Sequence, residues 1–442
     1  MKTAFIYHAS WVPGLHLGAA RLALLNYLYA KKHGGSCVLI CNDIASPPKP
    51  FHDSLPMLLE WLNIRWGEGP YHNVHFRGKY REVVERLLSC NLAYYDYATP
   101  EEIHSEQQAA RKSKEPFLYS RLYEGHTPTD CRNWEAEGRK AVIRLRMPRT
   151  DDETYRYEEA IMDDMIYDRK ITDLATENDY VIQRTDGSYT TYLTQAVDYD
   201  LHNIDVVFRD INDRASLAAE TFIARWAGLK QPKFGHIPYF AGPVGSHRFS
   251  PKHDKDYARH VEFCEMLDLV MEIDAKIPTY SQWGVFHPCY VRFYEKVGFL
   301  PEAVSHYLYQ SLLKTSVECD SRPLTASQMA SKLELDSVDP GIKQFDTEAL
   351  EACQREAMKG CGLGRKAKLI HSLARSIRPF DYKRDFGGVQ SEAVQAFKDF
   401  AESQDLFLIG EAALRPNDLP CGFAPEPTLE EDAFTNEGCP HS

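Results

Sequence analysis

Residues 13–21 read PGLHLGAAR. They follow a short apolar run, residues 3–7 (TAFIY), and include the beginning of a longer periodic segment, residues 16–32. Apolar residues in that segment recur three and four positions apart, which is typical of an amphipathic helix. A Gly-Gly pair at 34–35 ends the helix, and residues 37–41 (CVLIC) have the pattern of a buried strand. Strand, helix and strand in this order predict a right-handed crossover in a parallel sheet, and therefore an α/β fold.

The start of the predicted helix is suited to binding phosphate. A helix that follows a parallel strand presents free backbone N–H groups and the positive end of its dipole at the ligand edge of the sheet. His16 can donate a hydrogen bond to a phosphate oxygen, and Gly18 leaves room for a flat base against the backbone. A lone H-x-G is also found where a histidine sits in a tight turn, so the motif alone leaves both interpretations open.

Length, charge and cysteine content limit the class of protein. A chain of 442 residues predicts several domains. The formal net charge of −13 argues against a uniformly basic protein that binds membranes or nucleic acid by charge alone. The eleven cysteines include no C-x-x-C pair, and the sequence shows neither an apolar leader nor an uninterrupted apolar stretch of membrane-spanning length. We therefore expect a cytoplasmic protein with reduced thiols and no membrane association.

Residues 13–28 resemble the HIGH signature, and the helix after it, in the glutamyl branch of the class I aminoacyl-tRNA synthetases. Further segments resemble this family in the same order along the chain, which extends the resemblance from residue 1 to about residue 355. They are residues 65–71 (RWGEGPY), 97–102 (YATPEE), 143–148 (IRLRMP), 181–188 (VIQRTDGS), 299–308 (FLPEAVSHYL) and 345–346 (FD).

The resemblance implies a Rossmann-like parallel sheet with an inserted acceptor-binding subdomain, followed by mostly α-helical stem-contact and C-terminal regions. The predicted domains are residues 1–90 (first half of the catalytic domain), 91–178 (insertion), 179–254 (second half of the catalytic domain), 255–330 (stem contact) and 331–442 (shortened helical C-terminal domain with an acidic tail). Within them we expect a strand of the second half at 180–184, helices at 261–273 and 301–313, a linker at 321–341 and a flexible tail at 417–442.

The second signature of the family, KMSKS, is a loop whose lysines stabilise phosphates, and its counterpart here is residues 242–253 (GPVGSHRFSPKH). Aligned on Ser250, Arg248 replaces the first lysine and Pro251 the second, so Lys252 or His253 substitutes only with a shift of one residue. Cations at this place would stabilise the charge that builds on the leaving pyrophosphate. Arg248 and Lys252 are equally compatible with ordinary surface cations.

The resemblance therefore implies catalytic roles for five residues. They are His16, Gly18, Arg248, Ser250 and Lys252, of which His16, Gly18, Arg248 and Lys252 would bind ATP. Mg²⁺ is expected only as the partner of ATP.

The amino-acid pocket departs from the family pattern. The family has an arginine on the first strand, which helps to hold the carboxylate of the substrate side chain, and a glutamate on the second strand, which meets its ammonium group. Here Ile6 stands at the first position, and the second strand carries Ile40 for another arginine and Asn42 for the glutamate. Truncating a buried charge pair costs about 2–5 kcal/mol. A less charged amino acid, or a non-standard acid, should therefore fit better than glutamate.

Three charged residues remain around this pocket. Asp43 survives from the acidic cluster of the second strand, Asp198 matches the first of two paired aspartates of the family, and Arg209 is retained in residues 208–213 (FRDIND). We predict that Asp43, Asp198 and Arg209 bind the substrate. The alternative for Arg209 and Asp198 is a structural ion pair at the edge of the sheet.

Partners follow from the same resemblance: tRNA and a small amino-acid substrate, bound by a monomer. Residues 359–384 are strongly basic, and Lys366, Lys368, Arg375 and Arg378 are the predicted tRNA contacts, with basic solvated surface as the alternative. Some family members bind zinc through a Cys-x-Cys in the insertion. Residues 95–98 (YDYA) occupy that place here, so no metal site is expected.

The leading hypothesis is a glutamate–tRNA ligase-like enzyme that activates an acid as its adenylate and transfers it to tRNA. The alternative is a catalytically degenerate paralogue that acts as an RNA-binding or regulatory protein, favoured by Pro251 and the altered 208–213 segment. A third hypothesis transfers the activated acid to a modified base or to a small-molecule amine.

Overall fold

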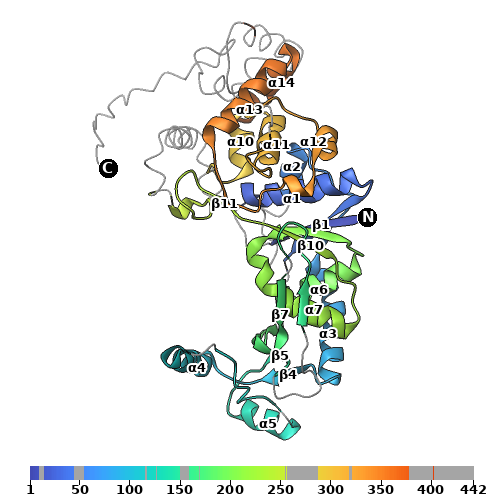
Figure 1. Cartoon of the computed structure of the whole chain (residues 1–442), viewed down its shortest axis with the longest axis vertical. Helices are drawn as coiled ribbons and strands as arrows, with labels where there is room; N and C mark the ends of the chain where they lie inside the picture. Colours follow the sequence, from blue (N-terminus) through green and yellow to red (C-terminus); the bar gives the residue numbers. More distant parts are fainter. Residues whose placement is uncertain are drawn as a thin grey trace, which may run out of the picture.

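The computed structural model describes residues 1–8, 14–43, 54–114, 117–125, 127–149, 159–168, 170–253, 255, 287–317, 321–377 and 402. Along its longest axis the molecule has a helical region at one end, a parallel sheet in the middle and a small antiparallel sheet at the other end (Figure 1).

Five parallel strands form the central sheet in the order β10-β9-β1-β2-β3. Their bounds are Lys2–His8 (β1), Ser36–Asn42 (β2), Glu68–His72 (β3), Val206–Asp210 (β9) and Lys233–Ile237 (β10). The sequence prediction of an α/β fold with a Rossmann-like parallel sheet is confirmed. Because the strands are parallel, their carboxyl ends meet at one edge, which is where α/β sheets bind ligands.

Helices cover both faces of this sheet. Helix α1 (Leu17–Lys32) packs on one face, where Phe5 and Phe208 are buried in its cluster. Helices α6 (Thr191–Leu201) and α7 (Leu217–Ala227) lie on the other face (Figure 1). Neighbouring residues of β1 therefore pack against helices on opposite faces of the sheet, because side chains alternate between the two faces along a strand.

A buried asparagine on α1 ties β1 and α1 to β9, a strand that comes much later in the sequence. Asn26 is fully buried, its Nδ2 donates to the carbonyl of Phe208 at 2.8 Å, and its Oδ1 accepts from the Phe208 N–H at 3.0 Å. Its own carbonyl accepts from the hydroxyl of Thr3 at 2.9 Å. One side chain thus satisfies both backbone groups of a residue in β9, while its backbone holds β1.

The predicted insertion forms its own small sheet. Strands β4 (Ala93–Asp96), β5 (Val142–Leu145) and β8 (Val181–Gln183) pair antiparallel in the order β4-β5-β8. Helix α3 (Arg77–Ser89) leads from the central sheet to it, and the antiparallel strand pair β6 (Glu159–Met162) and β7 (Lys170–Asp173) lies between β5 and β8 in the sequence. Helices α4 (Pro100–Ser113) and α5 (Pro128–Ala136) lie at its far end (Figure 1).

The strand expected at 180–184 is present as β8, but it pairs with β5 of the insertion and not with the central sheet. The small sheet therefore continues past the boundary predicted at residue 178. A strand of only three residues such as β8 has too little sequence pattern to indicate which strand it pairs with.

The helical end of the molecule shares one hydrophobic core with the α1 face of the sheet. It contains α2 (Ser54–Trp61), α10 (Val291–Val297), α11 (Pro301–Gln310), α12 (Ala326–Lys332), α13 (Thr347–Gly360) and α14 (Leu363–Ile377). Helix α11 confirms the helix expected at 301–313. The helix expected at 261–273 and the tail at 417–442 lie outside the described residues.

The linker predicted at 321–341 is wrong. Helix α12 begins with a capping box in which Thr325 and Gln328 each bond the backbone of the other, and its Met329 is buried in the shared core. The composition of this segment, rich in Ser, Asp and Pro, suggested a loop. Its T-x-x-Q pattern is a helix start.

Short elements complete the chain. The strands β11 (Phe240–Ala241) and β12 (Lys343–Gln344) pair parallel. The short 3-10 helices are η2 (Asn73–Phe76), η3 (Leu174–Thr176), η4 (Ile211–Ser216), η5 (Pro251–His253) and η7 (Leu335–Ser337). The β11–β12 pair connects the sequence just before the predicted KMSKS-like loop to the helical end.

Replacing Asn26 by leucine should lower the free energy of unfolding by about 2–4 kcal/mol, because the N–H and the carbonyl of Phe208 would lose their buried partner. Denaturant unfolding of both proteins measures this difference. The control Lys31→Ala removes an exposed side chain from the same helix and should cost less than about 0.5 kcal/mol. Equal stability of the two variants would show that Asn26 does not hold β9.

Candidate active site

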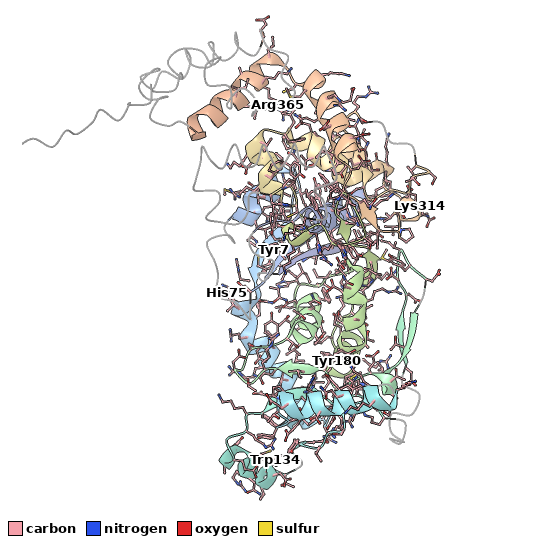
Figure 2. All side chains as sticks on the ribbon, turned by 90° about the vertical axis from the view of Figure 1, so that its left-hand side faces the viewer. Tyr7, His75, Trp134, Tyr180, Lys314 and Arg365 are labelled. Atoms are coloured by element: carbon pink, nitrogen blue, oxygen red, sulfur yellow. The ribbon has the colours of Figure 1, made fainter. Side chains whose placement is uncertain are left out.

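The predicted nucleotide-binding residues lie at the edge of the sheet where the strands end. Helix α1 begins at Leu17, after β1 has ended at His8. Tyr7, near the end of β1, lies in the middle part of the molecule, between Trp134 of the insertion and Arg365 of α14 (Figure 2).

His16 caps α1 and contacts the predicted loop. Its Nδ1 accepts a hydrogen bond from the N–H of Gly18 at 3.2 Å, so its proton is on Nε2, which donates to the carbonyl of Phe249. Burial lowers the pKa of His16 to about 4, a shift that the bond to Phe249 opposes and the charge of Arg248 reinforces. His16 is therefore a neutral hydrogen-bond donor at pH 7, directed at the residue before Ser250.

Residues 242–253 fold back on the sheet. Phe249 is fully buried, stacks on Phe345 at 4.8 Å, and its N–H donates to the carbonyl of Phe240. This anchor holds Arg248 at the sheet edge, where its Nη2 lies 2.8 Å from Oδ2 of Asp210, the last residue of β9.

Ser250 is half-buried directly after this anchor. The Ser250 Oγ accepts from the N–H of Lys252 at 3.4 Å, and the Lys252 side chain is exposed. The structure thus brings His16, Gly18, Arg248 and Ser250 to one place, with Lys252 at its rim.

Asp43 and Asp198 meet on the other side of the sheet edge. Asp43 is buried, and its carboxylate accepts from Nδ1 of His72 at 2.7 Å and from the N–H of Val74 at 3.1 Å. Asp198 on α6 accepts from the hydroxyl of Tyr80 at 2.6 Å. Asn73 joins them, since its Oδ1 accepts from the N–H of Asp43 and its side chain also bonds to Asp198.

The Asp198 carboxyl is unusually basic. Burial raises its pKa from 3.8 to about 7, hydrogen bonds from Tyr80 and Asn73 oppose this shift, and the charge of Asp43 adds to it. At pH 7 this group is therefore only partly ionised, unlike an exposed aspartate.

Arg209 belongs to a separate buried network. Its Nη1 lies 2.9 Å from Oε2 of Glu220 on α7 and 3.2 Å from the hydroxyl of Tyr199, and its Nε donates to Nε2 of His236 at 3.2 Å. The cavity beside it, lined also by Ile6, is about 20 Å³, which is room for about one water molecule. Arg209 therefore forms a structural ion pair, which was the alternative to substrate binding, but its partner is Glu220 and not Asp198.

Comparison with known proteins identifies the family. Residues 13–254 match the model of the catalytic domain of the class I tRNA synthetases (E and Q), which is more than half of the chain. The chain belongs to this family. The resemblance to the glutamyl branch inferred from the sequence is confirmed by the curated relatives.

Three such relatives are glutamate–tRNA ligases. Glutamate–tRNA ligase 1 of Xanthobacter autotrophicus is 27% identical over 84% of this chain and 69% of the relative. Glutamate–tRNA ligase 1 of Caldanaerobacter subterraneus is 30% identical over 52% of this chain and 47% of the relative. Glutamate–tRNA ligase 2 of Chelativorans sp. is 28% identical over 80% of this chain and 65% of the relative. The chain thus spans between about half and about two thirds of the length of these relatives.

Solved structures support the fold. A glutamate tRNA ligase from Elizabethkingia meningosepticum, crystallised with its amino acid, superposes with a TM-score of 0.69 at 18% identity, covering 94% of this chain and 79% of that chain. The glutamate–tRNA synthetase of Elizabethkingia anophelis gives a TM-score of 0.70 with 94% and 80% coverage. At this identity the likeness concerns the fold alone.

Several residues of the site escaped the sequence analysis. Glu220 is the one acidic residue in the apolar helix α7, and an acid on a buried face is a usable signal for a buried cation. Tyr80 and Asn73 gave no such signal, because their roles depend on where η2 and α3 lie against α6.

Three of the four predicted tRNA contacts, Lys366, Lys368 and Arg375, belong to α14. Lys368 is exposed and Lys366 half-buried, while the buried residues Ala367 and Ile370 pack in the shared core. Arg375 belongs to α14, but its side chain is outside the described part of the chain, as is all of Arg378.

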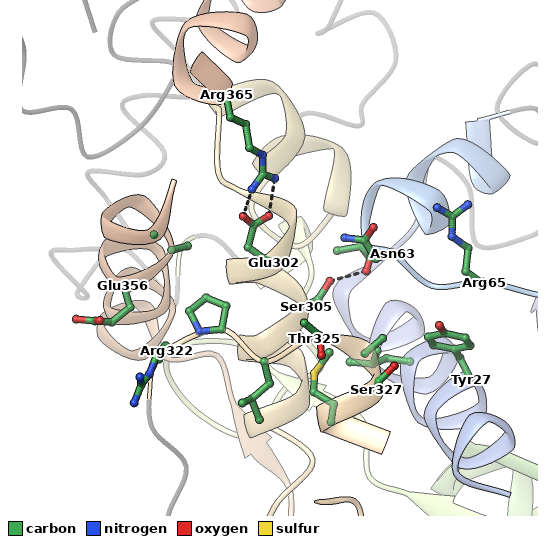
Figure 3. Close-up of a pocket in the computed structure, with 18 of the residues that line it drawn as sticks. Tyr27, Asn63, Arg65, Glu302, Ser305, Arg322, Thr325, Ser327, Glu356 and Arg365 are labelled. Carbon is green, nitrogen blue, oxygen red and sulfur yellow. Dashed lines mark hydrogen bonds and ion pairs between the residues drawn. The ribbon is translucent and has the colours of Figure 1, made fainter. Parts of the chain in front are cut away.

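A pocket of about 880 Å³ lies between α1 and the helical end of the molecule (Figure 3). Tyr27 of α1, Glu302 of α11 and Thr325 line it, and a bidentate ion pair joins Glu302 to Arg365 at its margin (Figure 3). None of the predicted site residues lines this pocket, so its size does not identify the site of the family's chemistry.

The described ranges of the chain offer neither a cluster of metal ligands nor a membrane-spanning helix. These ranges contain no group of three or more His, Cys, Asp or Glu that could hold a metal ion. None of the helices in them has the length and apolar composition needed to cross a bilayer.

Replacing Asp198 by asparagine should change how stability depends on pH. The carboxyl binds its proton more tightly when folded (pKa about 7) than when unfolded, so its stabilising contribution is full below pH 4 and is lost as the pH rises through 7. Relative to the wild type, the variant should gain about 2 kcal/mol in free energy of unfolding between pH 5 and pH 8.

Denaturant unfolding at the two pH values tests this expectation. Leu193→Ala, an apolar truncation on the same helix, should destabilise the chain equally at both. Parallel curves for wild type and Asp198→Asn would mean that this carboxyl is ionised throughout.

Replacing Arg209 by methionine should cost about 3–5 kcal/mol of stability, because the buried Glu220 would lose its counter-charge. Adding Glu220→Leu should recover most of this loss, and a double-mutant cycle in denaturant measures the coupling. Additive losses in the two single variants would exclude a coupled pair.

Proposed function

We propose that this chain activates a carboxylic acid with ATP as its adenylate and transfers the acyl group to tRNA. The observation that carries this proposal is the contact between His16 and Phe249, which joins the start of α1 to the loop bearing Arg248 and Ser250. Family membership supports the reaction type, and the glutamate–tRNA ligase names of the relatives support the acceptor.

The start of α1 and the loop provide complementary groups for a triphosphate. The N-terminus of α1 supplies the positive end of a helix dipole, and neutral His16 supplies one N–H donor. Arg248 and Lys252 supply positive charge from the other side. Mg²⁺ would arrive with the phosphate oxygens of ATP.

The proposed chemistry requires positioning and charge more than covalent help. An oxygen of the substrate carboxylate attacks the α-phosphorus of ATP, and the bond to the leaving pyrophosphate breaks. Negative charge then accumulates on pyrophosphate, where Arg248 and Lys252 would stabilise it. A hydroxyl of the acceptor tRNA next attacks the acyl carbon, and AMP leaves.

The substrate pocket supports an acid other than glutamate. Ile40 is fully buried in the sheet, Ile6 lies on the same face, and the guanidinium of Arg209 is engaged by Glu220. A glutamate side chain would need to compete with Glu220 for this cation. The desolvation of its carboxylate would then be poorly offset.

The insertion is the part proposed to bind the acceptor end of tRNA. Helix α14, with Lys366 and Lys368, is proposed to contact the phosphate backbone of the tRNA. The two surfaces lie at opposite ends of the molecule (Figure 1). A tRNA bound to both would therefore run along its length.

One observation favours the degenerate paralogue as a second candidate. The donor of His16 is occupied by Phe249, and Arg248 is paired with Asp210, so both groups must change partners before they bind phosphate. In a catalytic chain His16 and Arg248 would leave these partners when ATP binds, whereas in a degenerate chain they would keep them.

Pyrophosphate exchange into ATP tests the activation step, using the standard amino acids and other carboxylic acids with and without tRNA. Both His16→Ala and Arg248→Ala should lower the exchange rate about 100-fold or more, as loss of one preorganised transition-state donor does. Lys79→Ala, an exposed cation on α3, is the matched control and should exchange as the wild type does.

Unchanged exchange in His16→Ala would contradict the proposed site. Absence of both exchange and ATP binding in the wild type, the latter by calorimetry, would favour the degenerate paralogue. Pyrophosphate exchange with at least one of the acids, without formation of acylated tRNA, would indicate a different acceptor.

A further inference from the structure

The proposed substrate pocket contains a buried hydrogen-bond donor, the side-chain amide of Asn42, that finds no acceptor in the described part of the chain. Asn42 is the last residue of β2, only 8% exposed, and on the same face of the strand as Val38 and Ile40. Its Nδ2 has no hydrogen-bond partner among the described residues. An unpaired buried donor costs about 1–3 kcal/mol, which a bound acceptor would recover.

The backbone determines which atom of Asn42 is free. The N–H of Asp43 can only donate, and it donates to Oδ1 of Asn73 at 3.0 Å. The Nδ2 of Asn73 must therefore face Asn42, and it donates to Oδ1 of Asn42 at 2.9 Å. Turning the Asn42 amide would place two NH₂ groups against each other, so the group left free is a donor.

The acids around Asn42 are already engaged. The Asp43 carboxylate accepts from His72 and from the N–H of Val74, and Asp198 accepts from Tyr80 and Asn73. Burial also leaves Asp198 partly protonated at neutral pH. A ligand ammonium group placed here would meet the Asn42 NH₂ and no uncommitted carboxylate of these two aspartates.

Asn42 lies where it can reach the substituents nearest the reacting carboxylate. In the proposed reaction that carboxylate must lie at the strand ends beside the start of α1. Asn42 ends β2, which pairs directly with β1, so that Asn42 is the register partner of His8. A group one or two bonds from the carboxylate is therefore the one that Asn42 selects.

We infer that Asn42 is a specificity-determining residue and that the acid activated here carries an uncharged acceptor oxygen, keto or hydroxyl, next to its carboxylate in place of an ammonium group. This inference rests on the proposed function. A 2-oxo or 2-hydroxy acid satisfies the Asn42 donor, whereas the corresponding amino acid leaves it unpaired and adds a buried cation.

Matched acids test the inference with the full chain. Each set holds the side chain constant: leucine with 2-hydroxy-4-methylpentanoate and 4-methyl-2-oxopentanoate, and likewise phenylalanine and glutamate with their hydroxy and oxo forms. Pyrophosphate exchange measures activation, and calorimetry with a non-hydrolysable ATP analogue measures binding. We expect an oxygenated acid to exceed its amino partner about tenfold or more in at least one set, and the hydroxy and oxo arms show which oxygen is preferred.

Two variants connect the preference to Asn42. Asn42→Leu should lose the preference for the oxygenated acid, and Asn42→Glu, which offers an acceptor, should shift it toward the amino acid. Gln183→Leu, which removes an amide from β8 of the insertion, should keep the wild-type preference. The thermal unfolding midpoint of each variant identifies any loss that comes from misfolding.

The outcomes separate the two proposals. An amino acid preferred in every set, or a preference unchanged in Asn42→Glu, would overturn the inference while the activation reaction stands. Failure to bind any of the acids overturns the inference even if ATP binds. Failure to bind ATP overturns the proposed function as well.

Discussion

The hydrogen bonds between Asn26 and Phe208 are the contact on which the site depends most. The catalytic domain is interrupted by a long insertion, so its two halves must be joined by contacts that are distant in sequence. One buried amide satisfies both backbone groups of Phe208 and excludes a shift of α1 along β9. Because α1 carries His16 and β9 carries Asp210, this constraint also brings the start of the helix to the residue that holds Arg248.

Three buried charged residues near the sheet edge are satisfied by other groups of the chain. Arg209 is held by Glu220, Asp43 by His72 and a backbone N–H, and Asp198 by Tyr80. Each arrangement avoids the cost of an unpaired charge in a low-dielectric interior. As a result, charged residues that look available in the sequence are already committed in the fold. In the proposed reaction, recognition of the substrate then depends on weaker, uncharged contacts such as the Asn42 Nδ2, which has no partner among the described residues.

The sequence predicted the central sheet well, since residues 3–41 combine two strand patterns with a helical period and a glycine stop. It also predicted a common site for His16, Gly18, Arg248 and Ser250, and in the structure the start of α1 contacts the loop that carries Arg248 and Ser250. The partner of Arg209 could not be chosen, because Asp198 and Glu220 lie on different helices and only the packing of α6 and α7 decides between them. Helix α12 was not predicted, because the Ser, Asp and Pro content of its segment is typical of a loop, whereas its capping box is the local signal for a helix.

The orientation of Asn42 could not be read from the sequence either, because it depends on a chain of donors that starts at the backbone of Asp43. Substituting an amide for a carboxylate removes a charge. It does not by itself reveal whether the oxygen or the nitrogen faces the ligand. The Asp43 N–H removes this ambiguity, because a backbone amide can never accept. A single peptide group thus determines the polarity of a side chain in the pocket, and through it the kind of acid that the site can hold.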